Sequence, residues 1–458
     1  MKYSFSARIP KDKEIAVATL ASEDAVERAP DRRATLDVDI GKREDMTLRK
    51  LITSVRKIVV AAKSAQKKKI VITFSDFIFP QLDLTPAEVA ELIAVNLEMA
   101  NFEFVVYKTK PKEGWNTLTE VVIVGKSDAS IVRGCKKGKL IGEGVNHARM
   151  LANTPGGDMT PERLGESARE AAQGLPIEVK VLDEIDIEEL GMGGVLGVGK
   201  GSNEKPRFIV MEYMQGEEGE KPLVLVGKGI TFDTGGLNLK PSAHIYEMHM
   251  DMSGGAIVIS AVVLAAKMKL KKNIVALVPA AENMPSGSSY HPGDQLRTMS
   301  GKTIEVMNTD AEGRVVLADA LTYAKRYKPR LVVDVATLTG AAQVALGTRA
   351  SAIFSKDERL IAQFRLLGEA TGDYVWPLPL WDEYEDDIKG TFGDWANDGK
   401  SRYGGAIQGA IFLYQFAKDY PWVHIDMAPR MTATDGDYLA KGAAGEPLRL
   451  LVRLLETF

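Results

Sequence analysis

The feature that most constrains this chain is an apolar run followed at once by charged residues between glycines. The run is Leu223 to Val226, and a short apolar run of this kind, bounded by glycine, is consistent with a fully buried strand. Lys228 and Asp233 follow it directly, inside a stretch that ends at Gly236. Because a lysine that abuts a buried strand needs a partner, we expect carboxylates to meet this segment in the fold.

More charged side chains follow at intervals. Lys240 and Asp251 come first, and Asp310, Glu312 and Arg314 then share one short stretch. Positions two apart in an extended segment point the same way, so Asp310 and Glu312 are predicted to reach one site. Four carboxylates that converge on one site repel each other strongly unless cations hold them. Two divalent ions would cancel that charge.

The donor types narrow the choice of metal. Oxygen-rich ligands with one nitrogen and no thiolate suit zinc, manganese, magnesium or cobalt more than copper or an iron–sulfur cluster. Lys228 binds metal only as the neutral amine, which needs a depressed pKa that metal binding itself supplies. Lys240 is better left charged, as an electrophile. Two ions roughly 3.5–4 Å apart share and acidify a water molecule.

Each of these residues is also compatible with a purely structural role. The stretch Asp233 to Gly236 is typical of a turn, and Asp251 before Ser253 is placed to cap a helix. The stretch Asn308 to Arg314 is compatible with a surface loop. Taken singly, each motif is better explained by a structural role than by a functional one. The recurrence of all the motifs in order along the chain favours the functional interpretation.

The stretch Asn308 to Arg314 resembles the signature of the leucyl aminopeptidase family, two-metal exopeptidases of the cytosol. The resemblance covers about the last two thirds of the chain, from Asn146 onward, and is weak before that. Further stretches that fall in the family's order and spacing are Gly227 to Gly236, Lys240 to Ser242, Pro292 to Asp294, Gly301 to Thr303, Ala336 to Gly340 and Gly405 to Ile407.

The resemblance implies roles for individual residues. One metal ion would be held by Lys228, Asp233, Asp251 and Glu312, and the other by Asp233, Asp310 and Glu312 with the backbone carbonyl of Asp310. The catalytic pair maps onto Lys240 and Arg314, and the arginine would hold a bicarbonate ion as general base. No histidine lies inside any of the motifs, so an ordinary histidine base is not expected. The pocket for the first substrate residue maps onto Met248, Thr337 and Gly340, with the Leu338 carbonyl receiving the substrate's backbone N–H.

The resemblance also implies an activity and an assembly. The expected reaction is removal of the N-terminal residue, mainly Leu, Met and other apolar residues, from peptides. The expected cofactors are two divalent ions, Mn or Zn before Co or Mg, together with bicarbonate. The expected assembly is a homohexamer of two stacked trimers. The chain departs from the family at Asp426 to Pro429 and at Arg430, a region that shapes the pocket wall with Met427 or Met431. If Arg430 enters the pocket, acidic residues become good substrates.

Composition agrees with an intracellular enzyme. The 58 basic and 62 acidic residues give a net charge of −4, which indicates neither general nucleic-acid nor membrane affinity. The single cysteine, Cys135, has no internal disulfide partner, which favours a reducing compartment. We find no signal peptide and no apolar stretch of about 20 residues, and expect a cytoplasmic protein. Two alternatives stay open: a two-metal phosphoesterase, and an added DNA-binding or assembly role.

The 458 residues exceed the usual size of one domain. We predict an α/β chain with a smaller, macro-like N-terminal domain at 1–128 that serves assembly, a linking helix at 129–155 and a catalytic domain at 156–458. In the first domain, strands are predicted at 15–20, 34–39, 70–74, 102–107 and 121–124, with helices from 48 and over 86–100.

The second domain alternates strand and helix, which predicts a mixed, mostly parallel sheet flanked by helices. Strands are predicted at 208–213, 223–226, 274–279, 331–335 and 423–427, and helices at 254–267, 315–326, 358–370, 406–418 and 447–455. The ligand motifs follow strand ends or lie in connecting loops, where open α/β sheets place their sites. The glycine-rich stretch 194–201 nearly matches a phosphate-binding loop, but Gly201 replaces the Ser or Thr that binds magnesium, so we predict a flexible turn.

Overall fold

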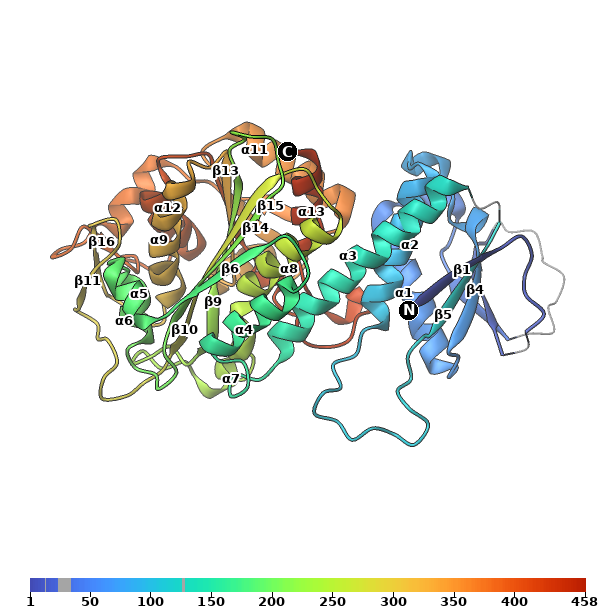
Figure 1. Ribbon diagram of the computed structural model, residues 1–458, viewed down its shortest axis with the longest axis horizontal. Helices are drawn as coiled ribbons and strands as arrows, with labels where there is room; N and C mark the ends of the chain where they lie inside the picture. The colour runs from blue at the N-terminus through green and yellow to red at the C-terminus, as the bar shows by residue number, and fades with distance from the viewer. Residues whose placement is uncertain (13, 24–33, 126–127) are drawn as a thin grey trace. The chain divides into compact units, whose positions relative to one another are not determined.

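The computed structural model describes residues 1–12, 14–23, 34–125 and 128–458 (Figure 1). The chain divides into two compact units. The smaller comprises Met1–Asn146 with Ala433–Lys441, and the larger comprises His147–Thr432 with Gly442–Phe458. The boundary falls inside the long helix α3 (Ala129–Asn153).

The smaller unit is built on a five-stranded sheet in the order β1-β5-β4-β2-β3, with every neighbouring pair parallel. Its strands are β1 (Lys2–Ser6), β2 (Ala16–Ala21), β3 (Thr35–Asp39), β4 (Lys69–Thr73) and β5 (Glu120–Val124), and its helices α1 (Leu48–Ser64) and α2 (Pro86–Asn101) pack on each other. Thr47 and Thr85 cap these helices through their side chains.

One strand predicted in this unit is wrong. The stretch 102–107 forms no strand, although its Phe104 and Tyr107 rings touch each other. The sheet edge beside β5 is instead filled by β1, a pairing between the start of the chain and residue 120 onward. A local apolar pattern does not reveal which of two segments pairs with a strand that is distant in the sequence.

The larger unit contains a nine-stranded sheet in the order β15-β14-β17-β13-β8-β10-β7-β6, with β9 beside β10. Its strands are β6 (Glu178–Leu182), β7 (Arg207–Met214), β8 (Leu223–Gly227), β9 (Gly229–Asp233), β10 (Asn273–Asn283), β13 (Leu331–Ala336), β14 (Ser351–Phe354), β15 (Val375–Pro377) and β17 (Trp422–Asp426). The central strands β17, β13, β8 and β10 are parallel, whereas β7, β6 and β14 pair antiparallel. The predicted mixed, mostly parallel α/β fold is confirmed.

Helices cover both faces of this sheet (Figure 1). On one face lie α6 (Gly193–Gly199), α9 (Glu312–Ala324) and α12 (Gly405–Ala417), and on the other α4 (Pro161–Ala172), α8 (Ser253–Lys267) and α13 (Leu448–Thr457). The remaining helices of the unit are α5 (Glu184–Glu189), α7 (Ser242–Ile245), α10 (Gly340–Leu346) and α11 (Glu358–Thr371). A small sheet joins β11 (Gln295–Arg297), β12 (Thr303–Glu305) and β16 (Trp395–Ala396).

The glycine-rich stretch 194–201 is not the flexible turn that we predicted, because most of it forms α6. Asp319 of α9 accepts hydrogen bonds from the first amides of that helix, Gly194 N at 2.8 Å and Val195 N at 3.0 Å. A side chain at Gly194 would sit 2.6 Å from the Val315 carbonyl, so glycine lets α6 press against α9. Tertiary packing and a capping carboxylate therefore override the poor helix propensity of glycine.

The segment Met248–Lys267 is long and apolar enough to cross a membrane by length and composition. In this fold 89% of its most apolar window is buried inside the protein. It packs α8 against β8, β10 and β13. These contacts identify it as a core helix of the larger unit.

Candidate metal centre

The charged residues that the sequence singled out meet where central strands of the larger sheet end. Lys228 lies between β8 and β9, and Asp233 is the last residue of β9. Asp251 lies in a single turn of 3₁₀ helix (Met248–Met252) that leads into α8. Asp310 lies just before α9, and Glu312 is its first residue. The predicted extended segment from Asp310 to Glu312 is therefore wrong; a helix start brings the two carboxylates together instead.

Two glycines allow this close approach. A side chain at Gly254, near the start of α8, would lie 2.1 Å from the Val335 carbonyl of β13. A side chain at Gly313 would lie 2.6 Å from the Lys228 amine. Because neither clash arises, α8 and α9 both bring their first turns against the segment after β8. Asp251 does not cap α8, whose N-cap residue Met252 makes no side-chain capping bond.

The side chains form two contiguous groups of charges. Lys228 Nζ lies 2.7 Å from Asp251 Oδ2 and 2.7 Å from Glu312 Oε1. Lys240 Nζ lies 2.8 Å from Asp233 Oδ2 and 2.5 Å from Asp310 Oδ1. One carboxylate oxygen from each of Asp233, Asp310 and Glu312 lies within 4.8 Å of the others. Glu312 thus belongs to both groups.

Burial and ion pairing act in opposite directions on the pKa values of this cluster. Burial raises the pKa of all four carboxyl groups, and the lysines act against that rise. Burial alone would lower the pKa of Lys228 and Lys240, but the surrounding carboxylates outweigh it and raise both values. The two lysines therefore act as counterions. A metal ion that takes Lys228 as a ligand must first displace its proton.

The residues present fit divalent cations. Within the described part of the chain, Glu312 Oε2 is buried and accepts no hydrogen bond. A buried carboxylate oxygen without a donor is costly unless a cation or an ordered water satisfies it. Four carboxylates against two ammonium groups also leave an excess of negative charge. Oxygen donors with one amine are ligands that divalent ions accept.

Arg314 lies on α9 one residue beyond Gly313. Its Nη1 donates to the Asn397 carbonyl at 2.6 Å, and Asp398 Oδ1 is 3.9 Å from the same atom. The side chain is buried, and among the described residues its Nε has no hydrogen-bond acceptor. Arg314 does not line the cavity beside the carboxylates. It is thus the one predicted catalytic or ligand side chain that lies outside the cavity wall.

A cavity of about 290 Å³ opens at this cluster. Its wall contains all four residues predicted to bind substrate, Met248, Thr337, Leu338 and Gly340, together with Lys228, Asp233, Lys240, Asp251, Asp310 and Glu312. Four further wall residues were not named as site residues from the sequence, Pro241, His244, Thr339 and Gln343, whereas Ala428 belongs to the stretch Asp426 to Pro429 that was expected to shape the wall. Gln343 lies three positions after Gly340 on α10, so helical spacing was a usable signal for it. His244 lies two residues beyond the motif that ends at Ser242, so the cavity wall contains a histidine although none of the motifs does.

The sequence left open whether Met427, Met431 or Arg430 lines the pocket, and the structure distinguishes between them. Met431 lines the cavity, whereas Met427 is fully buried and does not. Arg430 does not enter it. Its Nε donates to Glu446 Oε2 at 2.9 Å, its Nη2 to Glu446 Oε1 at 2.7 Å and its Nη1 to the Thr348 carbonyl at 2.7 Å. The alternative in which Arg430 reaches into the pocket is therefore not realised.

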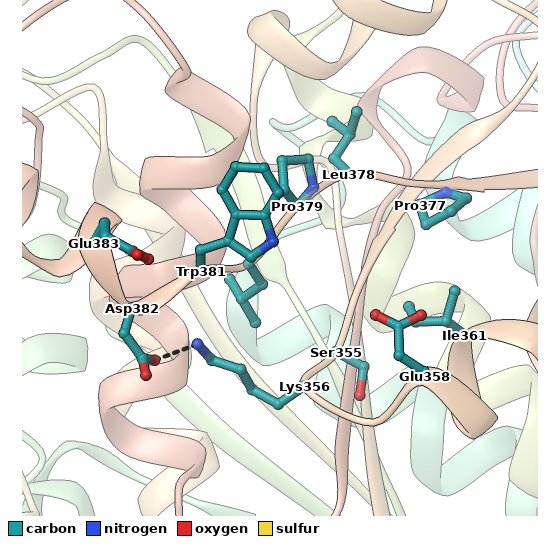
Figure 2. A pocket seen from close by; sticks show the side chains of 11 residues that line it. Ser355, Lys356, Glu358, Ile361, Pro377, Leu378, Pro379, Trp381, Asp382 and Glu383 are labelled. Atoms are coloured by element: carbon teal, nitrogen blue, oxygen red, sulfur yellow. Dashed lines mark hydrogen bonds and ion pairs between the residues drawn. The ribbon is translucent and has the colours of Figure 1, made fainter.

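A larger cavity, of about 730 Å³, lies beyond the end of β14 (Figure 2). It is walled by the stretch Pro377 to Glu383 and by Ser355, Lys356, Glu358 and Ile361. Lys356 and Asp382 form an ion pair there, and Trp381 is largely exposed. Because none of the predicted ligand, catalytic or substrate residues lines this cavity, size alone does not locate the chemical site.

Comparisons with known proteins agree with this geometry. Residues 146–452 match the model of the cytosol aminopeptidase family, catalytic domain. A probable cytosol aminopeptidase of Roseiflexus castenholzii is 42% identical over 433 residues, which cover 93% of this chain and 87% of that protein. A probable cytosol aminopeptidase of Geobacter sulfurreducens is 46% identical over 376 residues, 81% of this chain and 75% of that protein.

Among solved structures, the bottromycin maturation enzyme BotP in complex with Mn superposes with a TM-score of 0.87 at 31% identity. The superposition covers 97% of this chain and 99% of BotP. The family match, the curated relatives and the superposition each extend over most of the larger unit, in which the carboxylate cluster lies. The chain belongs to the cytosol aminopeptidase family and is a metal-dependent enzyme that hydrolyses peptides at their N-terminus.

Proposed function

We propose that two divalent cations occupy the cluster, with Glu312 and Asp233 shared between them. The first set of ligands is Lys228, Asp233, Asp251 and Glu312, and the second is Asp233, Asp310 and Glu312 with the Asp310 carbonyl. The observation that carries this proposal is the buried arrangement in which Glu312 faces Lys228 on one side and the Asp233–Asp310 pair on the other. Manganese or zinc is the favoured metal, since the related BotP was solved with Mn; cobalt and magnesium suit the same donors.

When bound, such ions supply Lewis acidity to a water molecule and to the scissile carbonyl. Lys240 is proposed to stay charged and to stabilise the oxyanion that develops on that carbonyl. Its ammonium lies within 2.8 Å of Asp233 and lines the cavity, so it reaches the place where the reacting atoms would lie. Asp251 is proposed to pair with the free α-amine of the substrate, which restricts cleavage to the first residue.

Arg314 is proposed to hold a bicarbonate ion that acts as general base. A guanidinium matches a planar oxyanion through paired N–H donors, and Arg314 Nε has no acceptor among the described residues. His244 offers a competing base, because it lines the cavity. His244→Ala should keep most of the activity if bicarbonate is the base, while removal of bicarbonate from the buffer should lower it. The opposite pattern would assign the base to His244.

The substrate class follows from the wall around the first residue. Met248, Met431, Leu338, Gly340 and Ala428 make it largely apolar, and methionine adapts to varied shapes. We propose broad hydrolysis that favours Leu and Met, with Asp and Glu poor and N-acetylated peptides not cleaved. Hydrolysis of leucine anilide against nitrophenyl phosphate, in the same metal-loaded sample, tests this function against a two-metal phosphoesterase.

The remaining proposals concern the whole protein. The resemblance favours a homohexamer of two trimers in the cytoplasm, with the N-terminal part of the chain serving assembly. The net charge of −4 gives no support to nucleic-acid binding as a main role. A salt-dependent gel shift with duplex DNA tests an added DNA-binding role.

A further inference from the structure

The carboxylate of Asp426, the last residue of β17, holds the loop that lies beside the carboxylate cluster. Its Oδ1 accepts hydrogen bonds from Leu338 N at 3.1 Å, Thr339 N at 3.3 Å and Ala428 N at 3.2 Å. Its Oδ2 accepts from the Thr339 hydroxyl at 2.6 Å. The side chain is 0% exposed. One carboxylate therefore satisfies two successive amides of a loop whose next residues begin α10.

This pairing fixes the direction of two carbonyl groups. In a trans peptide the C=O points opposite to the N–H of the same unit, and the peptide bonds of this loop are trans. Since Leu338 N–H points at Asp426, the Thr337 carbonyl must point away, and it accepts from Lys228 Nζ at 3.2 Å. By the same geometry, the Thr339 N–H at Asp426 turns the Leu338 carbonyl away from β17. Leu338 lines the cavity.

The same loop is tied to the ligand cluster at its other end. The Thr337 hydroxyl donates to Asp251 Oδ1 at 2.6 Å. The loop therefore touches both Lys228 and Asp251, while Asp426 secures it from behind. Displacement of the two amides would move the Thr337 and Leu338 carbonyls together.

We propose that Asp426 is a positioning residue that aims the Leu338 carbonyl at the backbone N–H of the substrate. The proposal rests on the proposed function and on the role that the family resemblance implies for the Leu338 carbonyl, which is to receive the substrate's backbone N–H. Asp426 touches neither substrate nor metal in this assignment. Its effect passes through the loop from Thr337 to Gly340.

The test compares two leucine substrates that differ only in this N–H. Leucinamide offers a scissile N–H, and leucine methyl ester does not. Asp426→Ala should lower kcat/KM for the amide by about tenfold or more, mainly through KM, and leave the ester within about threefold, since a hydrogen bond contributes about a factor of ten. Asp426→Asn should keep most of the amide activity, because its amide oxygen can replace Oδ1 and its NH₂ can donate to Thr339.

Asp319→Ala is the matched control. Asp319 is also buried and accepts three backbone N–H groups, from Gly194, Val195 and Met299, but it does not contact the loop. This variant should be less stable than the wild type, but its kcat/KM should change to the same extent for the amide and for the ester. Metal content by elemental analysis should equal that of the wild type in Asp426→Ala and Asp426→Asn.

Equal losses on amide and ester, loss of metal in Asp426→Ala, or an Asn variant as poor as the Ala variant would each overturn the proposal. If Asp426→Ala does not fold, Thr339→Val removes the donor to Oδ2 and should show the same bias toward amide loss, only smaller; an unbiased loss there overturns the proposal equally. A wild-type enzyme that cleaves neither substrate would instead contradict the proposed function.

Discussion

Arg430 and Glu446 form a buried, two-point ion pair behind the cavity wall, with N–O distances of 2.9 and 2.7 Å. Each partner is almost fully buried, so the charge of Arg430 is neutralised where it lies. The residues on either side of Arg430 in the same short segment, Ala428 and Met431, face the cavity. The guanidinium thus anchors the wall and does not present charge to the substrate.

The first prediction is that acidic first residues are poor substrates. Met248, Ala428 and Met431 line the cavity without a charge, and Arg430, which could have paired with a carboxylate side chain, is held by Glu446 outside it. Turnover should fall in a graded way among Leu, Met and other apolar residues, since a methylene in such a pocket is worth about 1–3 kcal/mol. Leu-, Met-, Arg- and Glu-amidomethylcoumarin measure it. A preference for Glu over Leu would contradict the placement of Arg430.

The second prediction is dependence on metal with unequal sites. One proposed site includes the Lys228 amine and the other has oxygen ligands alone, so their affinities should differ. Chelation should abolish peptidase activity, and Mn, Co and Zn should restore it to different extents. Calorimetric titration of the metal-free enzyme should show two classes of site. Full activity in protein shown to be metal-free by elemental analysis would end the two-metal assignment.

The sequence predicted best what depends on continuous apolar runs. The central strands β8, β10, β13 and β17 are buried along their length, and each appeared within a few residues of its observed position. Neighbouring parallel strands end at the same edge of a sheet. Motifs that directly follow these strands are therefore expected to lie close together in the fold. Lys228, which follows β8, therefore donates through Nζ at 3.2 Å to the carbonyl of Thr337, which follows β13 and lies 109 positions further along the chain.

Contacts between distant segments escaped the sequence for a physical reason. The helix α6 exists because Asp319 caps it across 125 positions, which no local pattern contains. The partner of Arg430 is Glu446, and neither residue lies in a motif. The position of His244 on the cavity wall depends on how the short helix α7 turns after Lys240. These features arise from side-chain packing between distant segments, which the hydrophobic periodicity of the sequence does not reveal.

The third prediction concerns pH and Asp319. Burial raises its pKa from 3.8 to about 7, although three backbone amides act against that rise. A carboxyl group whose folded-state pKa is raised stabilises the fold most below its unfolded pKa, and this contribution is lost as pH rises toward 7. The free energy of unfolding of the wild type relative to Asp319→Asn should therefore fall between about pH 4 and pH 7. Urea denaturation of both proteins across that range measures it; a relative stability that rises with pH would contradict the direction.

The fourth prediction is assembly. The family that this chain joins by sequence is expected to form two stacked trimers, so sedimentation should give a mass near six times the 49.9 kDa chain. Activity should fall on dilution if assembly supports the site. A fully active monomer would contradict the hexamer without affecting the metal assignment.

The last prediction separates the electrophile from the ligands. Lys240 lies within 2.8 Å of Asp233 and Asp310 but is itself proposed to bind no metal. Lys240→Ala should lower kcat by about 100- to 1,000-fold, the usual effect of losing a donor to a developing oxyanion. Its metal content should remain at the wild-type level, because the change removes a cation that competes for the same carboxylates. Asp251→Ala and Glu312→Ala should instead lose metal and activity together, since each removes a ligand. Elemental analysis of the three purified variants, beside their turnover of leucine anilide, decides the matter: if Lys240→Ala also lost metal, the lysine would have to be counted among the groups that build the metal sites.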